Sequence, residues 1–351
     1  MKPISINLDE LDSTIDDKIL EQAFGEKSLG LIIINQMPKD YLSLRDKVLK
    51  SSSILANLSD DILKLLEIKE SIYLVGWSLG KEKLENGNFD LLKGSFYINC
   101  SFFKDSKLEG PNLSDIESFS EFKSYTIKNQ WFDSIKNKEQ IKQLEELKDF
   151  QKDCKALINY ILQIGLKLSE KLDSYIWSHV NKEDYYSKGY LPYIVKNSTT
   201  TKARLLHYFP LKSIKQNDFD DNLWCGEHVD HSCLTALTSA MFVDESEAIS
   251  NGLENDKDFS GLYIQISTNK EKLRIDIPRD SLVFQIGSSL QEISCNKFNA
   301  VRHCVRTSKS MKNLNIARNT LAIFMQPNLD DKINKSENFA QYSLRILKEN
   351  H

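Results

Sequence analysis

The sequence has few of the features that mark secreted or membrane proteins. Its six cysteines are spread over 351 residues and form no CxxC pair, which argues against a disulfide framework and favours reduced thiols in a cytoplasmic protein. Even the longest purely apolar stretches are short, such as Leu31–Ile34, so we expect no transmembrane helix. The first residues lack the basic and apolar pattern of a signal peptide.

Neither sign of charge dominates. The chain has 46 Lys+Arg against 50 Asp+Glu, which gives a formal net charge of −4. Nucleic-acid-binding domains usually carry a basic excess, and anionic membranes attract basic segments, so we expect neither partner. The 40% of hydrophobic residues is enough for a sizeable core.

The length allows two domains of roughly 150 residues each. The N-terminal third is mixed α/β, with strand-like runs at Ser5–Leu8 and Leu29–Ile34 and a helix at Ser59–Leu66 that starts on Ser59 as its N-cap. A long helix is expected over Lys138–His179, because its apolar residues recur every three or four positions. That stripe fits a scaffold helix packed on the core better than a coiled-coil partner surface.

From about Arg204 the chain reads as successive short strands without helices between them. This pattern predicts a sandwich, barrel or jelly roll. The expected strands are Arg204–Phe209, Leu234–Val243, Gly261–Ile266, Lys272–Ile277, Leu282–Ile286 and Thr320–Gln326. The acidic segment Asp244–Asp258 interrupts them and is interpreted as a surface loop; a divalent-cation site there is the alternative, although its spacing matches no EF-hand.

Three residues indicate a metal site. His228 and Asp230 are two positions apart, so they point to the same side of an extended segment. His303, in a strand-like run far along the chain, can complete the set. Two histidines and one carboxylate leave three coordination positions open, as in non-haem Fe(II) oxygenases. The simpler alternative is that His228 and Asp230 are surface polar residues.

Arg318 and Thr320 indicate an anion site. They too are two positions apart on an expected strand, where a guanidinium and a hydroxyl on one face can hold a carboxylate. A buried arginine near a metal is costly unless an anion completes the site. A dicarboxylic cosubstrate that chelates the metal at one end and pairs with Arg318 at the other meets this requirement.

Six segments of the chain, taken in their order along the sequence, resemble motifs of a known family. They are SINLD (5–9), GLIIIN (30–35), the long helix, LVFQIGSSLQ (282–291), FNAVRHCV (298–305) and RNT (318–320). Taken in this order, they resemble the Fe(II)- and 2-oxoglutarate-dependent oxygenases, in the branch that includes isopenicillin N synthase and the plant flavonoid and hormone oxygenases. The family motifs read GFFxVxN, LVVNIGDxLQ, FKSxxHRV and RxS. The ordered match covers most of the chain, and no single motif in it is specific.

The resemblance implies a mixed α/β (α+β) fold with a double-stranded β-helix, or jelly-roll, core at 200–330. A mixed N-terminal region (1–130) that is not independent, a long spine helix (131–180) and a C-terminal segment (331–351) would complete the chain.

The resemblance also implies a chemistry. His228, Asp230 and His303 would be the Fe(II) ligands at the catalytic centre, and Arg318 and Thr320 would anchor 2-oxoglutarate. The implied reaction is oxidation of a small organic substrate by O2, by default a hydroxylation, with release of succinate and CO2. Ascorbate is an optional further cofactor, and the oligomeric state stays open.

The chain departs from the family pattern in two places. At the family's NxY motif before a proline, the aligned stretch His207–Pro210 places Phe209 where a tyrosine helps to hold the cosubstrate; Tyr208 is the candidate to replace that contact. The interval from Asp230 to His303 is longer than is typical, and the acidic segment accounts for the excess.

Alternatives remain open at this point. His231 could replace His228 as a ligand, and Cys225, Cys233 and Cys304 could hold a structural zinc. His207 is expected to line the pocket or to be structural. The whole protein could instead be an oxidase like isopenicillin N synthase that does not use 2-oxoglutarate, or a non-catalytic jelly-roll binding protein. Tyr208, Phe284 and Met325 are expected near a partly apolar pocket.

Overall fold

The computed structural model describes residues 1–82, 89–111, 117–135, 142–211, 224–246, 252–253, 260–266, 269–311 and 314–349. Its helices are α1 (Asp17–Phe24), α2 (Lys39–Ala56), α3 (Asp60–Leu65), α5 (Lys123–Thr126), α6 (Phe150–His179), α7 (Tyr190–Asn197), α8 (Ser288–Ile293) and α9 (Phe339–Glu349). In these ranges, no helix combines the length and apolar character needed to cross a membrane.

The strands form two sheets. They are β1 (Ile4–Asn7), β2 (Leu31–Asn35), β3 (Gly76–Ser78), β4 (Lys93–Asn99), β5 (Lys202–Tyr208), β6 (Cys225–His228), β7 (Leu234–Thr238), β8 (Met241–Asp244), β9 (Gly252–Leu253), β10 (Gly261–Gln265), β11 (Lys272–Ile275), β12 (Leu282–Ile286), β13 (His303–Arg306) and β14 (Ile316–Met325). The large sheet has the order β1-β2-β12-β7-β14-β5-β4-β3, with β8 paired to β14 and β9 to β8. The small sheet has the order β11-β10-β13-β6. Strands from the N-terminal region therefore share a sheet with strands that follow residue 200.

The two sheets pack face to face. One apolar cluster contains Leu31 and Ile33 of β2 together with Leu262 and Ile264 of β10. Between them in β2, Ile32 points into the core on the opposite side. Because both faces of β2 are covered, its sequence is an unbroken apolar run rather than an alternating one.

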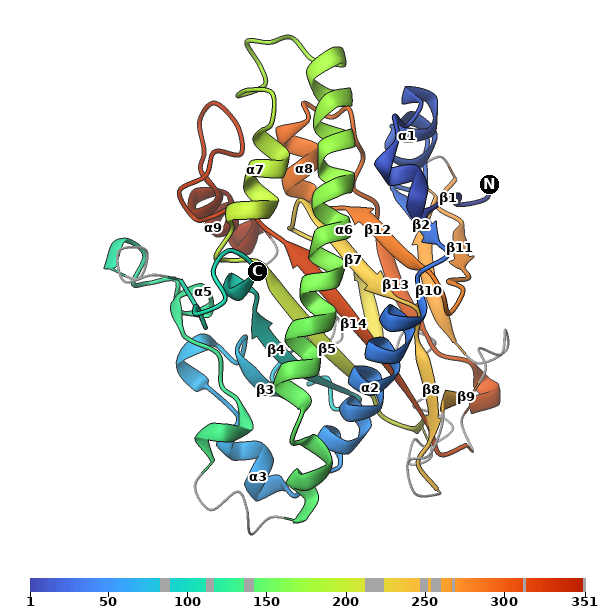
Figure 1. Cartoon of the computed structure of the whole chain (residues 1–351), viewed down its shortest axis with the longest axis vertical. Coiled ribbons are helices and arrows are strands. Elements are labelled where there is room, and N and C mark those ends of the chain that lie inside the picture. Colours follow the sequence, from blue (N-terminus) through green and yellow to red (C-terminus); the bar gives the residue numbers. More distant parts are fainter. Residues whose placement is uncertain are drawn as a thin grey trace.

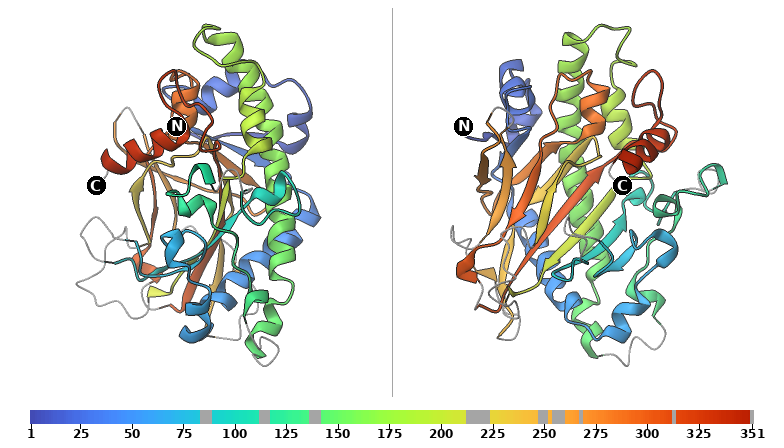
Figure 2. Two further views of the ribbon diagram at one scale, coloured as in Figure 1. Left: turned by 90° about the vertical axis from the view of Figure 1, so that its left-hand side faces the viewer. Right: turned by 180° about the vertical axis from the view of Figure 1, so that it is seen from behind.

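Helices α2 and α6 cover the other face of the large sheet (Figure 1). The two views in Figure 2 show α6, in green, on the side of the strands away from the small sheet. A Cβ atom on Gly165 of α6 would lie 2.4 Å from Cε of Met325, so the helix packs closely on β14. The buried stripe of α6 thus packs on the domain core, as the scaffold interpretation predicted.

Most predicted elements differ from the observed ones by a few residues at their ends, and the long helix differs by more. The long helix begins at Phe150 rather than Lys138, and a separate 3-10 helix occupies Lys142–Leu147. Phe150 packs against the rings of Phe96 and Phe132, with ring centroids 5.3 Å apart in both pairs, where the helix starts. Residues 136–141 lie outside the described part of the chain.

The predicted strand Leu234–Val243 is interrupted. It consists of β7 and β8, which pair with different halves of β14. Nη2 of Arg45, on α2, donates to the carbonyl oxygens of Ser239 and Ala240 at 2.8 and 3.0 Å. These bonds satisfy carbonyl groups at the break, so the chain can leave one strand and begin the next without burying an unpaired acceptor.

Candidate metal centre

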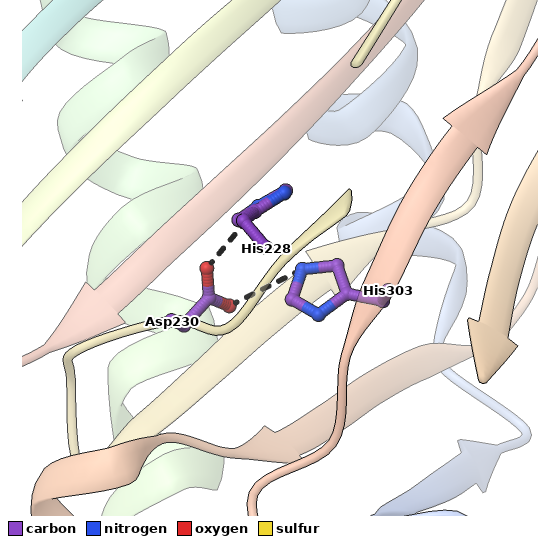
Figure 3. A group of neighbouring side chains, drawn as sticks. All are labelled: His228, Asp230 and His303. Carbon is purple, nitrogen blue, oxygen red and sulfur yellow. Dashed lines mark ion pairs between the residues drawn. The ribbon is translucent and has the colours of Figure 1, made fainter. Parts of the chain in front are cut away.

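Two strands of the small sheet bring the predicted ligands together. β6 and β13 are antiparallel neighbours, and their register places His228 opposite His303. Asp230 lies two residues beyond the end of β6. The two imidazole ring centroids are 4.3 Å apart, and the carboxylate of Asp230 faces both rings (Figure 3). The structure therefore assembles all three residues from segments about 70 positions apart in the sequence.

The ligand atoms lie close enough for one ion. Nε2 of His228 is 3.6 Å from Oδ1 of Asp230, and Nε2 of His303 is 3.7 Å from Oδ2. One potential ligand atom from each residue lies within 4.8 Å of the others. Asp230 and His303 are each 7% exposed, whereas the side chain of His228 is 43% exposed. The group is thus buried at Asp230 and His303 and open to solvent at His228.

Backbone carbonyl groups orient both imidazoles. Nδ1 of His228 lies 2.9 Å from the carbonyl oxygen of Gly226, and Nδ1 of His303 lies 3.3 Å from that of Val301. A histidine that donates from Nδ1 keeps its proton there and presents the lone pair of Nε2. Both Nε2 atoms face Asp230, so a metal ion bound to its carboxylate would lie within reach of one nitrogen of each ring.

Burial and neighbouring charges shift the pKa values of the three residues in different directions. Burial acts to raise the pKa of Asp230, but His303 and His228 together lower it. Burial lowers the pKa of His303 to about 4. For His228, burial acts to lower the pKa, but Cys225 and Asp230 raise it to about 9. Asp230 is therefore an anion and His303 a neutral base near pH 7, whereas His228 carries a proton that an incoming metal ion has to displace.

The predicted anion site lies in the same cavity. Strand alternation on β14 points Arg318 and Thr320 to one face, toward the cavity that also contains the three metal-site residues. Arg318 is 5% exposed, and its Nε and Nη1 atoms have no hydrogen-bond partner among the described residues. The Thr320 hydroxyl donates to the Thr238 carbonyl oxygen at 3.2 Å. Arg318 thus presents donors that nothing in the described chain satisfies.

Tyr208, not Phe209, faces Arg318. The register pairs Tyr208 of β5 with Arg318, and the guanidinium carbon lies 5.1 Å from the Tyr208 ring centroid. Tyr208 lines the cavity, whereas Phe209 packs against the helix-covered core. Of these two residues, only Tyr208 presents its side chain to the cavity, and it is the residue expected to replace the contact missing at Phe209.

Sequence reasoning missed two basic residues that line the cavity, Lys93 of β4 and Arg204 of β5. Arg204 lies two and four positions before Leu206 and Tyr208, so strand alternation could have placed it on the same face. Lys93 has no comparable signal, because its strand is buried along its whole length and does not alternate.

Other candidates lie elsewhere. His231 is exposed, with Nδ1 3.3 Å from the Ser288 hydroxyl, and it does not belong to the metal-site group. Across the described ranges, no group of three potential ligands includes a cysteine. His207 is structural: it lies on the opposite face of β5 from the cavity, with Nδ1 2.8 Å from Oδ1 of Asn319.

Two further predictions concern residues near the cavity and the acidic segment. The structure contradicts the first and describes too little of the chain to test the second. Phe284 and Met325 do not line the cavity; both lie beneath α6 at Gly165. Their strands alternate, and these two positions point toward the helices. Most of the acidic segment, residues 247–251 and 254–258, lies outside the described residues.

Comparisons with known proteins give one consistent result. No family model and no curated protein sequence matches the chain. Among solved structures, a Neurospora crassa protein in complex with alpha-KG and thymine is 15% identical, with a TM-score of 0.66 over 99% of this chain and 97% of that one. The rice dioxygenase for auxin oxidation is 13% identical, with a TM-score of 0.59 over 100% and 96% of the two chains. JOX2, solved with 2OG, Fe and JA, is 13% identical, with a TM-score of 0.62 over 99% and 85%. The chain therefore has a mixed helix-and-sheet fold found among 2-oxoglutarate- and Fe(II)-dependent oxygenases.

Proposed function

We propose that this protein is a non-haem Fe(II)- and 2-oxoglutarate-dependent dioxygenase that oxidises, by default hydroxylates, a small organic substrate. One observation carries the proposal: His228, Asp230 and His303 converge in the same cavity as a buried Arg318 with two unpaired donors. In this proposal the two facing sheets are the double-stranded β-helix core, and residues 200–330 supply all of these side chains.

The three converging side chains fit Fe(II). Two imidazole nitrogens and one carboxylate oxygen are the donor set of non-haem iron oxygenases, and they leave three positions for other ligands. The backbone bonds to both Nδ1 atoms fix the rings with Nε2 inward. His228, Asp230 and His303 would hold the ion, and the exposed side at His228 would admit O2 and substrate.

Arg318 fits the far carboxylate of 2-oxoglutarate. A buried guanidinium with unpaired donors is costly, and a carboxylate can pair with it bidentately. Thr320 would add a hydroxyl donor after its hydrogen turns away from the Thr238 carbonyl oxygen. Tyr208, stacked beside Arg318, would keep the guanidinium in place and border the cosubstrate.

Fe(II) and 2-oxoglutarate, when bound, supply the oxidation of substrate by O2 with release of succinate and CO2. The chain itself binds and orients the reactants. His303 and Asp230 hold their side of the centre away from solvent, and apolar side chains such as Leu237, Leu262 and Phe324 line the rest of the cavity. These side chains keep water from that side of the reacting groups.

The structural neighbours support the cofactors. The Neurospora crassa protein was solved with alpha-KG, and JOX2 with both 2OG and Fe. Their other bound molecules differ, thymine in one and JA in the other, so they do not indicate which substrate this chain oxidises. The isopenicillin N synthase-like branch stays a prediction from sequence.

The test measures CO2 release from 2-oxoglutarate labelled at C1, with the purified protein, Fe(II) and O2. We expect slow release that requires all three components and is lost in Asp230→Ala. An oxidase that does not use 2-oxoglutarate would bind Fe(II) but release no labelled CO2, and a non-catalytic binding protein would fail to bind Fe(II). Either result would reject the proposed function.

A further inference from the structure

Lys93 and Arg204 line the cavity that also contains Arg318, and we call these two residues the second polar wall. The residues lie on adjacent strands, and the β4–β5 register pairs Lys93 with Tyr208 and Arg204 with Tyr97. Both basic side chains line the cavity that contains the metal-site residues. The proposed iron and 2-oxoglutarate sites use neither of them, so they are available to a further molecule.

Acidic and hydroxyl groups hold this wall in place. The ammonium of Lys93 lies 3.0 Å from Oε2 of Glu82 and 2.9 Å from Oδ2 of Asp90. Glu82 also pairs with Nη2 of Arg204, and Nε of Arg204 donates to the Ser95 hydroxyl at 2.9 Å. Glu82 thus bridges both basic residues.

In these ion pairs the two acidic groups face the two basic groups. Burial acts to raise the pKa of Glu82, but Arg204 and Lys93 lower it to about 2. The charges of Lys93 and Arg204 are therefore cancelled by those of Glu82 and Asp90. The proposed iron centre is also balanced, because Fe(II) and Arg318 together match Asp230 and the two carboxylates of 2-oxoglutarate.

This charge balance determines whether a charged or an uncharged substrate group fits against Lys93 and Arg204. A carboxylate placed against Lys93 and Arg204 would leave one uncompensated negative charge in a largely buried cavity, which is costly. Lys93 has three N–H donors and Arg204 has five, and the partners named above use only part of them. An uncharged acceptor can take the remaining donors without changing the charge. Among the described lining residues, the only carboxylate is that of Asp230, so the cavity offers a substrate many donors and few free acceptors.

We propose that Lys93 and Arg204 select a substrate that presents an uncharged hydrogen-bond acceptor, such as an amide or imide carbonyl oxygen, and disfavour a carboxylate. This inference rests on the proposed function, since it assigns the substrate class of the same cavity. Glu82 acts as a positioning residue, because it holds both basic groups and sets the charge balance.

The test compares ligand pairs that share a skeleton but differ in charge. The probes are thymine with uracil-5-carboxylate, benzamide with benzoate, and indole-3-acetamide with indole-3-acetate. Dissociation constants are measured without O2, on the protein loaded with Fe(II) and 2-oxoglutarate. We expect the uncharged member of at least one pair to bind about tenfold tighter or more, a difference of roughly 1.4 kcal/mol. Equal or tighter binding of the carboxylates, or no binding by any uncharged probe, would overturn the inference.

Glu82→Gln makes the test specific. It removes one negative charge, so the preference for the uncharged probe should shrink or reverse. The matched control is Glu67→Gln, which makes the same change at the Glu67–Lys81 ion pair outside the cavity lining and should leave the preference unchanged. An unchanged preference in Glu82→Gln would also overturn the inference.

The same samples separate this inference from the proposed function. Fe(II) chelated by a 2-oxo acid gives a visible charge-transfer absorption. If that absorption does not form, the proposed function fails; if it forms and the probe preference is absent, only the inference about substrate class fails.

Discussion

At the scale of single residues, His228 and His231 form a natural matched pair. They lie three positions apart, yet only His228 belongs to the converging group. We expect His228→Ala to weaken Fe(II) binding by more than about 100-fold, since losing a direct ligand should exceed the roughly 10- to 100-fold effect of changing a residue that only orients a ligand. His231→Ala should leave Fe(II) affinity nearly unchanged. Anaerobic Fe(II) titration measures both, and equal losses in the two variants would argue against the assignment.

Arg318 is a buried side chain whose unpaired donors are expected to destabilise the ligand-free protein. Arg318→Met should weaken 2-oxoglutarate binding by about 100-fold, which corresponds to two charge-assisted hydrogen bonds worth about 1.5 kcal/mol each. It should not destabilise the ligand-free chain, because it removes two buried donors without partners. Thr320→Ser keeps the hydroxyl and is the control, with little change in affinity. Equilibrium dialysis and thermal unfolding are the measurements; a large loss of stability without a loss of affinity would contradict the role.

The sequence predicted some of these residues and missed others for a physical reason. His228, Asp230, Arg318 and Thr320 are visible because alternating positions on a strand share a face, which needs no tertiary information. Tyr208 was named as the replacement for Phe209, and it lies on the cavity face whereas Phe209 does not, because neighbouring positions of a strand point to opposite faces. The remaining cavity residues depend on which strands are neighbours in the sheet. No local sequence pattern encodes the pairing that brings Lys93 into the cavity.

At the scale of elements, the turn from β12 into α8 supports the segment that carries Asp230 of the proposed metal centre. Gly287 precedes α8, and its amide donates to the Cys233 carbonyl oxygen at 3.0 Å. The next amide, of Ser288, donates to the Asp230 carbonyl oxygen at 2.8 Å. A Cβ on Gly287 would lie 2.0 Å from the Ser232 carbonyl oxygen, so the backbone that carries Asp230 would have to move.

Gly287→Ala should therefore lower the free energy of unfolding by about 1–3 kcal/mol, the usual cost of overpacking, and also weaken Fe(II) binding. Gly226→Ala is the control, because a Cβ there meets nothing within 4 Å. Urea unfolding and Fe(II) titration follow the two effects. A Gly287→Ala protein with both properties intact would show that this turn does not position Asp230.

Element existence was more predictable than element bounds. The apolar runs at β2, β10 and β12 identify strands because burial requires them. The late start of α6 at Phe150 and the break between β7 and β8 depend on contacts with Phe96 and Arg45, which are distant in sequence. A single sequence shows neither contact.

At the scale of the whole molecule, Lys202 links stability to pH. Its side chain is 5% exposed, and its ammonium donates to the Leu74 carbonyl oxygen at 2.9 Å and to Oδ1 of Asn99 at 2.7 Å. Burial lowers its pKa from the ordinary lysine value of 10.5 to about 7. Between these two values the unfolded chain binds more protons than the folded chain at this position. The Lys202 contribution to stability should therefore rise with pH from about 7 to about 10.5.

Lys202→Met removes this titration while keeping an unbranched side chain. The difference in unfolding free energy between wild type and Lys202→Met should shift in favour of wild type by up to about 1.4 kcal/mol per pH unit above pH 7. Other titrating groups cancel in this comparison because both proteins contain them. Urea unfolding at pH 7 and pH 9 tests it, and a difference independent of pH would contradict the lowered pKa.

The central claim is that one cavity holds iron on His228, Asp230 and His303 and 2-oxoglutarate on Arg318. A crystal structure grown without O2, in the presence of Fe(II) and 2-oxoglutarate, tests it most directly. The account predicts iron on Nε2 of both histidines and on an Asp230 oxygen, with the far carboxylate of 2-oxoglutarate paired to Arg318 and near Thr320. Iron bound elsewhere, or 2-oxoglutarate bound without contact to Arg318, would contradict it.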